Sequence, residues 1–477
     1  MKNLFLSFLF ISLPALLAGQ NNSPKIIFSK DVFPDNVSWS IYVADAVTGE
    51  IISDKDGSVN LIPASVMKLV PTAVALNLLG DDYRFTTSLA FTGKLNRKKG
   101  ELDGNIVIIG GGDPMLGSPN YSDTYGDVPG KWAEAVKAAG IKKIKGNIVA
   151  DASVYDYQPV PGAWEWDDAG NYYGAGIHGL NFKNNSFSIY LHSNEEGSAP
   201  VVDSADAAGR YLKINNYLVT KGSSSKGIVY SAPYGNDVTL GGSIPANSHI
   251  TLDASLPDPP LATAILLRER LTSMGVSVSG DAVTRRTMAS NDTVLEMLST
   301  TISPTLKEMI TTTNQESINL FAGQLCKHLG LVYKNDPSFE AGMEVIRAFL
   351  DTNNISTGKV YLNDPSGLSR NNLTSALFMT NLLRYIYNSP LKDTFISSMP
   401  VSGTSGTLKN YFSDELLKGR IVAKTGSMTG VRALSGYVTA TSGRVMAFTI
   451  MVNGYTSPGR DIAANIEEII KSIVINY

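Results

Sequence analysis

Apolar and polar residues follow two different rhythms along this chain, which predicts strands in some segments and helices in others. Residues 37–52 alternate on both sides of a turn at 45–49, a pattern that predicts a β-hairpin. Apolar, β-branched runs recur at 420–425, 433–439 and 445–452, separated by short turns. These three runs predict an antiparallel meander near the end of the chain.

The helical pattern is strongest just after the hairpin. Residues 66–79 are apolar almost all round and stop at Gly80, so this stretch predicts a buried helix. Pro71 falls inside it, where a proline removes one hydrogen bond and kinks the axis. Further helices are expected at residues 262–274, 305–312, 318–329, 343–351, 375–387 and 462–473.

A long β-rich segment separates the first helix from the later ones. Residues 85–148 show strands and turns, and residues 186–253 show short strands with Ser, Gly and Asn turns. We therefore expect residues 91–285 to form one or more inserted β-rich domains. Residues 20–90 and 286–477 are expected to form one mixed α/β domain.

The N-terminus has the features of a secretory signal. Lys2 supplies a positive start, residues 4–18 carry no charge, and small residues precede the polar Gln20. The apolar run is too short to span a membrane comfortably, and no later segment is long and apolar enough. Residues 1–19 are therefore expected to be removed, leaving an exported, periplasmic protein with at most peripheral membrane contact.

Composition and charge exclude several classes of function. The chain of 477 residues has a formal net charge of −3, and only 17% of its residues are charged. Because it has no basic stripe with interleaved aromatic residues, nucleic acid is not an expected partner. With 43% hydrophobic residues the chain can bury a large core, so disorder is excluded for its bulk.

Metal and cofactor signals are missing from the sequence. The four histidines have neither a His-Glu-x-x-His pattern nor a Cys-x-x-Cys companion. The glycines at 110–112 lead into a turn at Asp113 and not into a nucleotide-binding helix. Cys326, the single cysteine, cannot form an intramolecular disulfide and is expected to be buried on a helix. We therefore expect no metal and no cofactor.

A serine and a lysine three residues apart open the apolar helix. Ser65 and Lys68 then lie on one helix face, where a hydroxyl nucleophile and an amine base can touch. The same Ser-x-x-Lys pattern begins at Ser223, Ser356 and Ser389, in a polar loop, across a Thr-Gly break and around a proline. Only Ser65 opens a helix, so its context selects it as the candidate nucleophile.

Two further motifs follow in order. Ser317 and Asn319 form a Ser-x-Asn step where a loop enters a helix. Lys424, Thr425 and Gly426 form a Lys-Thr-Gly step at the end of an edge-like strand. Ser-x-x-Lys, Ser-x-Asn and Lys-Thr-Gly, in this order, are the motifs of penicillin-recognising serine enzymes.

The resemblance extends beyond these motifs. Segments 63–68, 111–114, 366–370 and 400–403 resemble those of class C low-molecular-mass penicillin-binding proteins, which are serine D-Ala-D-Ala carboxypeptidases and endopeptidases of the bacterial cell wall. The resemblance covers nearly the whole chain after the leader. It implies an α/β, transpeptidase-like domain with a five-stranded antiparallel sheet and an all-α subdomain. It also implies a large β-rich insert between the first two motifs.

The same resemblance implies a mechanism. Ser65 would attack the carbonyl carbon between two D-alanines of a peptidoglycan stem peptide, Lys68 would take its proton, and β-lactam antibiotics would be covalent inhibitors. A lysine at its ordinary pKa of about 10.4 is a poor base at neutral pH, so burial and the cation Lys424 are expected to lower the pKa of Lys68 to about 7. The other implied roles are proton relay for Ser317, contact with the substrate amide for Asn319, binding of the terminal carboxylate for Lys424, Thr425 and Gly426, and an oxyanion hole from the N–H groups of Ser65 and Ser427.

Two other functions stay open. A serine β-lactamase would need a group that positions a deacylating water, and no Glu-x-x-Leu-Asn segment is found. A non-catalytic wall-binding protein of the same fold would not need the intact motifs. Turnover of a D-Ala-D-Ala peptide separates these possibilities. Pro365 and Ser405 stand where the family usually has glycine and aspartate, which leaves the details of two loops open.

Residues 153–185 are rich in Tyr, Trp, Pro and Gly and are expected to form a loop. Its aromatic residues include Trp164, Trp166, Tyr172 and Tyr173. We expect these side chains to serve as packing residues, in preference to a substrate platform.

Overall fold

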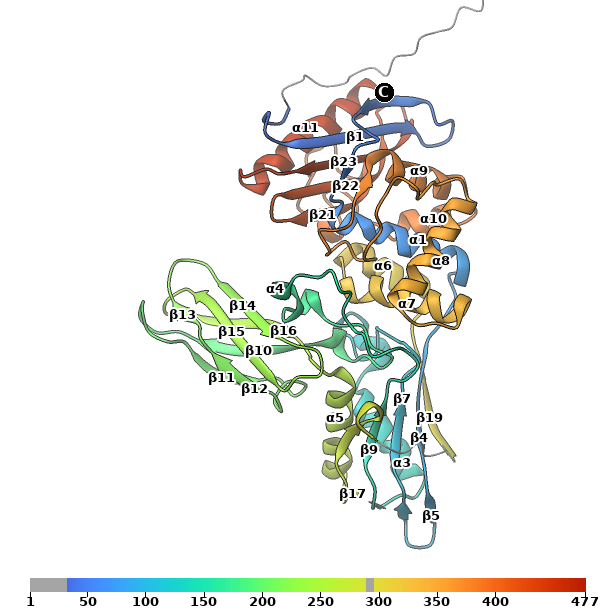
Figure 1. The fold of residues 1–477 in the computed structure, drawn as a ribbon, viewed down its shortest axis with the longest axis vertical. Helices are drawn as coiled ribbons and strands as arrows, with labels where there is room; N and C mark the ends of the chain where they lie inside the picture. The colour runs from blue at the N-terminus through green and yellow to red at the C-terminus, as the bar shows by residue number, and fades with distance from the viewer. Residues whose placement is uncertain (1–31, 289–295) are drawn as a thin grey trace, which may run out of the picture.

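The computed structural model describes residues 32–288 and 296–477. The molecule is elongated, and Figure 1 shows two halves: the early and late parts of the chain build one, and the middle of the chain builds the other. The leader expected at residues 1–19 lies outside the described residues. Of the helices in the described ranges, none is long and apolar enough to cross a membrane.

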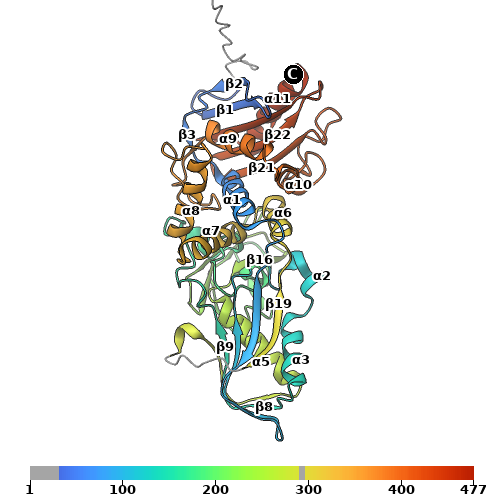
Figure 2. The same cartoon turned by 90° about the vertical axis from the view of Figure 1, so that its right-hand side faces the viewer.

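The first half is organised around a five-stranded antiparallel sheet in the order β2-β1-β23-β22-β21. Helix α11 packs on one face through its isoleucines, and α9 packs on the other (Figure 2). These elements are β1 (Ser38–Asp45), β2 (Ile51–Lys55), β21 (Ile421–Met428), β22 (Val431–Thr439), β23 (Val445–Asn453), α9 (Ala376–Tyr387) and α11 (Gly459–Asn476).

The predicted hairpin and meander are confirmed, since β1 pairs with β2 and β21 to β23 pair in sequence order. The turn of the hairpin is held by Asp45, whose Oδ1 accepts hydrogen bonds from the N–H groups of Val47 and Thr48. β1 is buried along almost its whole length instead of alternately. The polar residues that alternate with apolar ones in β1 are also buried, because helices cover both faces of the sheet.

A group of helices lies between the sheet and the second half (Figure 2). Each helix expected in this region is present, with ends displaced by a few residues. Pro71 is the third residue of α1, in the first turn, where a proline is tolerated, so no break forms inside the helix. The bounds are α1 (Leu69–Leu79), α6 (Leu306–Glu316), α7 (Asn319–Lys334), α8 (Phe339–Thr352) and α10 (Lys392–Ser397).

The second half contains a five-stranded sheet in the order β18-β9-β7-β4-β19, together with a small sheet in the order β17-β8-β6-β5. Strands β4 and β19 fall largely or wholly outside residues 91–285, so the strand pairing reaches beyond the range expected for the insert. The bounds are β4 (Thr86–Phe91), β5 (Lys94–Asn96), β6 (Glu101–Asp103), β7 (Ile106–Ile109), β8 (Lys143–Ile144), β9 (Ile148–Asp151), β17 (Ser277–Val278), β18 (Ala282–Thr284) and β19 (Glu296–Ile302).

Two helices, α3 (Val128–Ala138) and α5 (Pro259–Ser273), accompany these sheets. The sequence predicted α5 but read the α3 segment as strands and turns. α3 begins after Asp127, whose Oδ1 accepts a hydrogen bond from the Gly130 N–H, and a proline lies in its first turn. Both features are helix-start signals that outweighed the surrounding strand pattern.

A β-sandwich projects to one side of the second half (Figure 1). Its two sheets have the orders β11-β10-β16 and β12-β15-β13, with β14 also paired to β15, and they enclose an apolar core. The all-β prediction for residues 186–253 is confirmed. The bounds are β10 (Ser186–His192), β11 (Val201–Ala205), β12 (Lys213–Asn216), β13 (Val219–Thr220), β14 (Lys226–Ser231), β15 (Asp237–Ile244) and β16 (His249–Ser255).

Candidate active site

Ser65 and Lys68 lie in a 3-10 turn, Ala64–Lys68, that leads directly into α1. The sequence predicted an α-helix from Ser65 onward. The tighter 3-10 turn eclipses side chains three residues apart, which favours contact between these two. Lys68 Nζ donates a hydrogen bond to Ser65 Oγ over 2.9 Å. Ala64 has a φ of 47°, a conformation that is uncommon for a non-glycine residue and recurs at active sites.

Lys68 is completely buried and has an acceptor for each of its three N–H bonds. Besides Ser65 these are Asn319 Oδ1 at 2.5 Å and the backbone oxygen of Ser366 at 2.8 Å. Burial lowers the pKa of Lys68 to about 7, while the carboxylate of Asp364 acts in the opposite direction. Burial therefore acts as the sequence suggested, but the charge that Lys68 senses is an unforeseen aspartate.

Asp364 organises the loop that presents the Ser366 carbonyl to Lys68. It is fully buried, and its Oδ1 accepts hydrogen bonds from the N–H and the hydroxyl of Ser366 at 2.9 and 2.5 Å. Its Oδ2 accepts from the Ser369 N–H at 2.8 Å and from Asn372 Nδ2 at 2.7 Å. The loop is thereby folded around one carboxylate, which fixes the acceptor that faces Lys68.

Ser317 and Asn319 lie at the junction of two helices. Ser317 ends α6 with a φ of 61°, and Asn319 begins α7. Ser317 is therefore a left-handed helix end, where the sequence suggested entry from a loop. Asn319 Nδ2 donates a hydrogen bond to the backbone oxygen of Tyr173 over 2.8 Å. Because Tyr173 belongs to the middle of the chain, the second half of the molecule helps to orient the Asn319 amide.

Lys424 approaches Ser317 from β21. Its Nζ donates hydrogen bonds to Ser317 Oγ over 2.8 Å and to the backbone oxygen of Thr425 over 2.9 Å. Burial lowers the pKa of Lys424 well below its ordinary value, and the charge of Lys68 lowers it further. The site thus holds two serine–lysine pairs, each with a completely buried lysine.

β21 is the edge strand of its sheet and runs past the turn that carries Ser65. The Lys-Thr-Gly motif lies in the middle of β21, where the sequence placed it at the strand end. A Cβ atom at Gly426 would lie 2.6 Å from the backbone oxygen of Pro63 and 3.1 Å from the Ser65 nitrogen. Glycine is needed here because the strand and the turn approach this closely.

A cavity of about 680 Å³ opens at this site. Ser65, Ser317, Asn319 and Ser427 line it, whereas Lys68 and Lys424 do not. The structure therefore brings the three motifs together, with the hydroxyls at the cavity wall and the two amines hydrogen-bonded to them.

Thr425 also does not line this cavity. Its Oγ1 donates a hydrogen bond to Thr407 Oγ1 over 2.8 Å. The opposite wall of the cavity comes from the loop of the second half, including Glu165, Asp168 and Tyr172. Glu165 forms an ion pair with Arg370 over 3.1 Å, which joins the two halves at the edge of the site.

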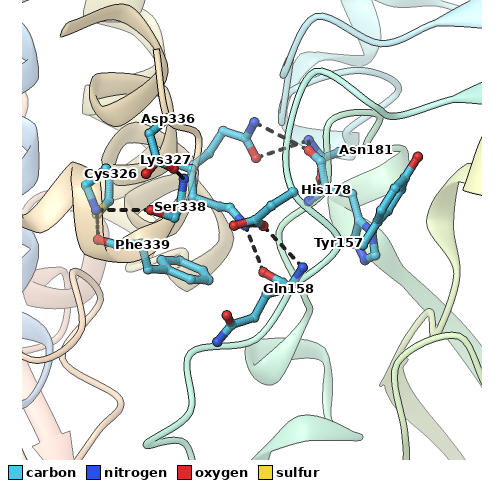
Figure 3. A network of polar contacts seen from close by, with 12 residues as sticks. Tyr157, Gln158, His178, Asn181, Cys326, Lys327, Asp336, Ser338 and Phe339 are labelled. Carbon is cyan, nitrogen blue, oxygen red and sulfur yellow. Dashed lines mark hydrogen bonds and ion pairs between the residues drawn. The ribbon is translucent and has the colours of Figure 1, made fainter. Parts of the chain in front are cut away.

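Buried polar contacts hold α7 against that same loop (Figure 3). Lys327 is fully buried, forms an ion pair with Asp156 and donates a hydrogen bond to the backbone oxygen of Gln158 over 2.8 Å. One turn earlier, Gln324 Oε1 accepts a hydrogen bond from Asn181 Nδ2 over 3.1 Å. The helix that begins with Asn319 is therefore fixed to the loop that lines the cavity.

Cys326 lies in α7 and is buried, as predicted from its isolation in the sequence. Within residues 32–288 and 296–477 no group of three or more His, Cys, Asp or Glu side chains could hold a metal ion.

The chain as a whole is similar to known proteins. Residues 30–473 match the model of the D-Ala-D-Ala carboxypeptidase 3 (S13) family. The chain belongs to this family of serine peptidases. The D-alanyl-D-alanine carboxypeptidase of Actinomadura sp. (strain R39) is 32% identical over 432 residues, which cover 88% of this chain and 78% of that protein. DacB of Haemophilus influenzae is 28% identical over 434 residues, covering 86% and 84%.

Solved structures share the fold of this family member. Penicillin-binding protein 4 (dacB) from Haemophilus influenzae matches with a TM-score of 0.82 and 24% identity, covering 93% of this chain and 98% of that chain. Bd3459, a predatory peptidoglycan endopeptidase from Bdellovibrio bacteriovorus, matches with a TM-score of 0.51 and 16% identity, covering 92% of each chain. The family and the penicillin-binding, mixed α/β fold predicted from the sequence are both confirmed.

Sequence reasoning missed the groups that position the motif residues. Two of them, the carbonyls of Ser366 and Tyr173, are backbone atoms, which no residue pattern identifies. Asp364 did carry a signal, because Asn and Asp next to Pro and Ser favour a turn that the side chain can close. The segment around Ser366 was noted only for its resemblance, with no role attached.

Proposed function

We propose that this chain is an exported serine D-Ala-D-Ala peptidase that trims peptidoglycan stem peptides and also cuts D-Ala–meso-diaminopimelate cross-links. The observation that carries the proposal is the buried Lys68 amine 2.9 Å from Ser65 Oγ at the wall of a large cavity. A relative that is named a D-alanyl-D-alanine carboxypeptidase supports the trimming activity. Cleavage of cross-links is a second activity that this proposal adds to trimming.

In the acylation step the neutral Lys68 amine accepts the Ser65 hydroxyl proton while Oγ bonds to the carbonyl carbon. The N–H groups of Ser65 and Ser427 stabilise the tetrahedral oxyanion. The bond to the leaving D-alanine then breaks, and its amine receives the proton that Lys68 took, relayed through the hydroxyl of Ser317, so that Lys68 is neutral again. A water molecule hydrolyses the resulting ester, which returns the proton to Ser65.

Substrate binding uses the remaining motif residues. The Asn319 amide has two N–H bonds, one directed at Tyr173, so the second is available for a carbonyl of the bound peptide. Lys424, with Thr425 and Gly426, binds the terminal carboxylate. An arriving carboxylate would favour the charged form of Lys424 and so act against the lowering of its pKa by burial.

Penicillin mimics the D-Ala-D-Ala bond with a strained amide and keeps its leaving group tethered, so it would form a stable ester on Ser65. The uncharged segment at residues 4–18 supports the proposal that the mature enzyme is periplasmic. We further propose that residues 86–302, from β4 to β19, form the inserted unit, because these strands close its larger sheet.

The test is to map the site of acylation. Labelled penicillin is incubated with the mature chain, and the modified peptide is identified by mass spectrometry. We expect the label on Ser65, no label in Ser65→Ala, and full labelling in Ser356→Ala, which alters a second Ser-x-x-Lys sequence. A label on another serine, or turnover by Ser65→Ala, would contradict the proposal.

The two peptidase activities are separated with purified wall fragments. Release of free D-alanine marks the carboxypeptidase, and conversion of cross-linked dimers into monomers marks the endopeptidase. Fast turnover of penicillin with no release of D-alanine would instead favour a β-lactamase. Binding of wall fragments without any turnover would favour a non-catalytic protein.

A further inference from the structure

An exposed aromatic cluster borders the cavity. Trp166 is 59% exposed and Tyr172 is 59% exposed, although both were expected to serve as packing residues. Trp164, in contrast, packs against the main apolar core, as expected. The loop of the second half therefore keeps Trp164 partly buried and presents Trp166 and Tyr172 to solvent.

The exposed rings are ordered by contacts with their neighbours. Trp166 begins the short helix α4 (Trp166–Ala169) and stacks on Tyr230 of β14, with ring centroids 6.4 Å apart and planes 21° apart. Tyr172 meets Tyr173 edge to face, with centroids 5.5 Å apart and planes at 86°. Rings held in place in this way lose little conformational freedom when a ligand binds.

The cluster is continuous with the wall of the active-site cavity. Tyr172 lines the cavity, and so do Glu165 and Asp168, which flank Trp166 along the chain. Consecutive Cα atoms are only about 3.8 Å apart, so the backbone of Trp166 lies one residue from the cavity wall. A molecule that leaves the cavity on this side would meet the exposed rings.

We propose that Trp166, Tyr230 and Tyr172 form an aromatic platform that binds the glycan strand of peptidoglycan while its stem peptide occupies the cavity. This inference rests on the proposed function, because it identifies the other part of the same polymer.

The chemistry of the platform fits a neutral sugar. A pyranose ring has an apolar face of C–H groups that packs flat on an aromatic ring, while its hydroxyl and N-acetyl groups point outward to polar partners. Asp167 and Asp168 add negative charge in the first turn of α4, whereas Glu165 is paired with Arg370. The two aspartates disfavour an anionic polymer such as nucleic acid or an anionic lipid surface. A single exposed aromatic residue is ordinary on a protein surface, whereas several that are joined to a cavity mark an interaction site.

The glycan can be tested without the peptide. Chitotetraose, a neutral oligomer of N-acetylglucosamine, is titrated by calorimetry into the full mature chain carrying Ser65→Ala, which removes turnover. We expect saturable binding, and we expect Trp166→Ala to weaken it about ten-fold or more, as for the loss of a central aromatic anchor. Trp166→Tyr keeps a ring and should retain most of the affinity. The matched control is Tyr361→Ala, since Tyr361 is 56% exposed but does not line the cavity, and this variant should bind as well as its parent.

A second measurement uses the unmutated chain. N-bromosuccinimide oxidises exposed tryptophan, and peptide mapping follows the oxidation of Trp166 with and without chitotetraose. Protection of Trp166 supports the platform. The proposal is overturned if chitotetraose does not bind, if it leaves Trp166 unprotected, or if a folded Trp166→Ala binds it as well as the parent does.

Kinetics separate this proposal from the proposed peptidase function. On insoluble polymeric peptidoglycan we expect Trp166→Ala to lower kcat/KM about ten-fold, in line with the loss of binding. On a short soluble D-Ala-D-Ala peptide, the kcat/KM of Trp166→Ala should equal that of the wild-type enzyme. If the parent hydrolyses neither substrate, the peptidase proposal fails while sugar binding stays measurable. If Trp166→Ala hydrolyses both substrates as well as the wild-type enzyme does, the platform proposal fails and the peptidase proposal stands.

Discussion

Asn319→Asp is the sharpest test of Lys68 as the base. In the wild type, Asn319 Oδ1 accepts a hydrogen bond from Lys68 Nζ over 2.5 Å. Aspartate has nearly the same shape, so the substitution places a carboxylate against the amine without a change in volume. A negative charge at this distance favours the ammonium form, which cannot accept a proton from Ser65.

The size of the effect follows from the titration of one group. With a pKa of about 7, half of the Lys68 amines are neutral at pH 7. An adjacent opposite charge shifts a pKa by about 1–3 units, so the neutral fraction at pH 7 would fall to between about one tenth and one thousandth. Acylation at pH 7 should therefore slow by about 5-fold to 500-fold and recover progressively as the pH is raised toward 10.

The assay is the second-order rate constant for acylation by a fluorescent penicillin between pH 5 and 10. For the wild type we expect a tenfold rise per pH unit below about 7 and a plateau above it. Asn319→Asp should move the midpoint upward, whereas Asn319→Leu should lower the rate without moving it upward. The pKa of buried Asp113 is raised to about 6, so Asp113→Asn is the control for an unrelated titration in this window. An unchanged midpoint in Asn319→Asp, or a pH-independent rate in the wild type, would refute Lys68 as the base.

Three further predictions use other parts of the structure. Gly426→Ala places a Cβ within 2.6 Å of a backbone oxygen beside the Ser65 turn. It should slow acylation about 10²-fold, the usual cost of a displacement near 1 Å. An unchanged rate would show that β21 can move freely. Lys424→Ala should raise KM for a D-Ala-D-Ala peptide more than it lowers kcat, and steady-state kinetics that show the reverse would count against a role in carboxylate binding. Lys327→Met leaves a half-buried carboxylate without its partner and should lower the thermal unfolding midpoint by the equivalent of about 1–3 kcal/mol, whereas Lys334→Met, which breaks an exposed ion pair, should leave the midpoint nearly unchanged.

Local sequence patterns predicted the elements well where one rhythm ran uninterrupted. The apolar helix, the C-terminal meander and the terminal helix are all present. The first is one long apolar run, the meander has β-branched runs between turns, and the terminal helix is amphipathic. Two local details were wrong. The Ser65 turn is 3-10 because packing against β21 overrides the helical pattern there, and α3 is a helix because Asp127 and a proline start it.

The sequence predicted the three motifs of the candidate site. It could not predict the groups that position the motif residues. Ser65, Lys68, Ser317 and Lys424 have side chains that a pattern can identify, and the structure brings them together. Their partners depend on how distant loops fold. The Asp364 carboxylate, for example, binds the N–H of Ser366, whose carbonyl accepts a hydrogen bond from Lys68 although the two residues are 298 positions apart in the chain.

The long segment between the first two motifs contributes contacts to the site itself. If it were a spacer, the second half would touch the site nowhere, yet the Tyr173 carbonyl fixes the amide of Asn319 and Glu165 pairs with Arg370 at the cavity edge. The buried Lys327 then attaches the helix of Asn319 to the same loop, so a movement of that loop would be transmitted to the amide. One wall of the site and the orientation of one motif residue thus depend on the second half, which explains why the three motifs on their own do not define the cavity.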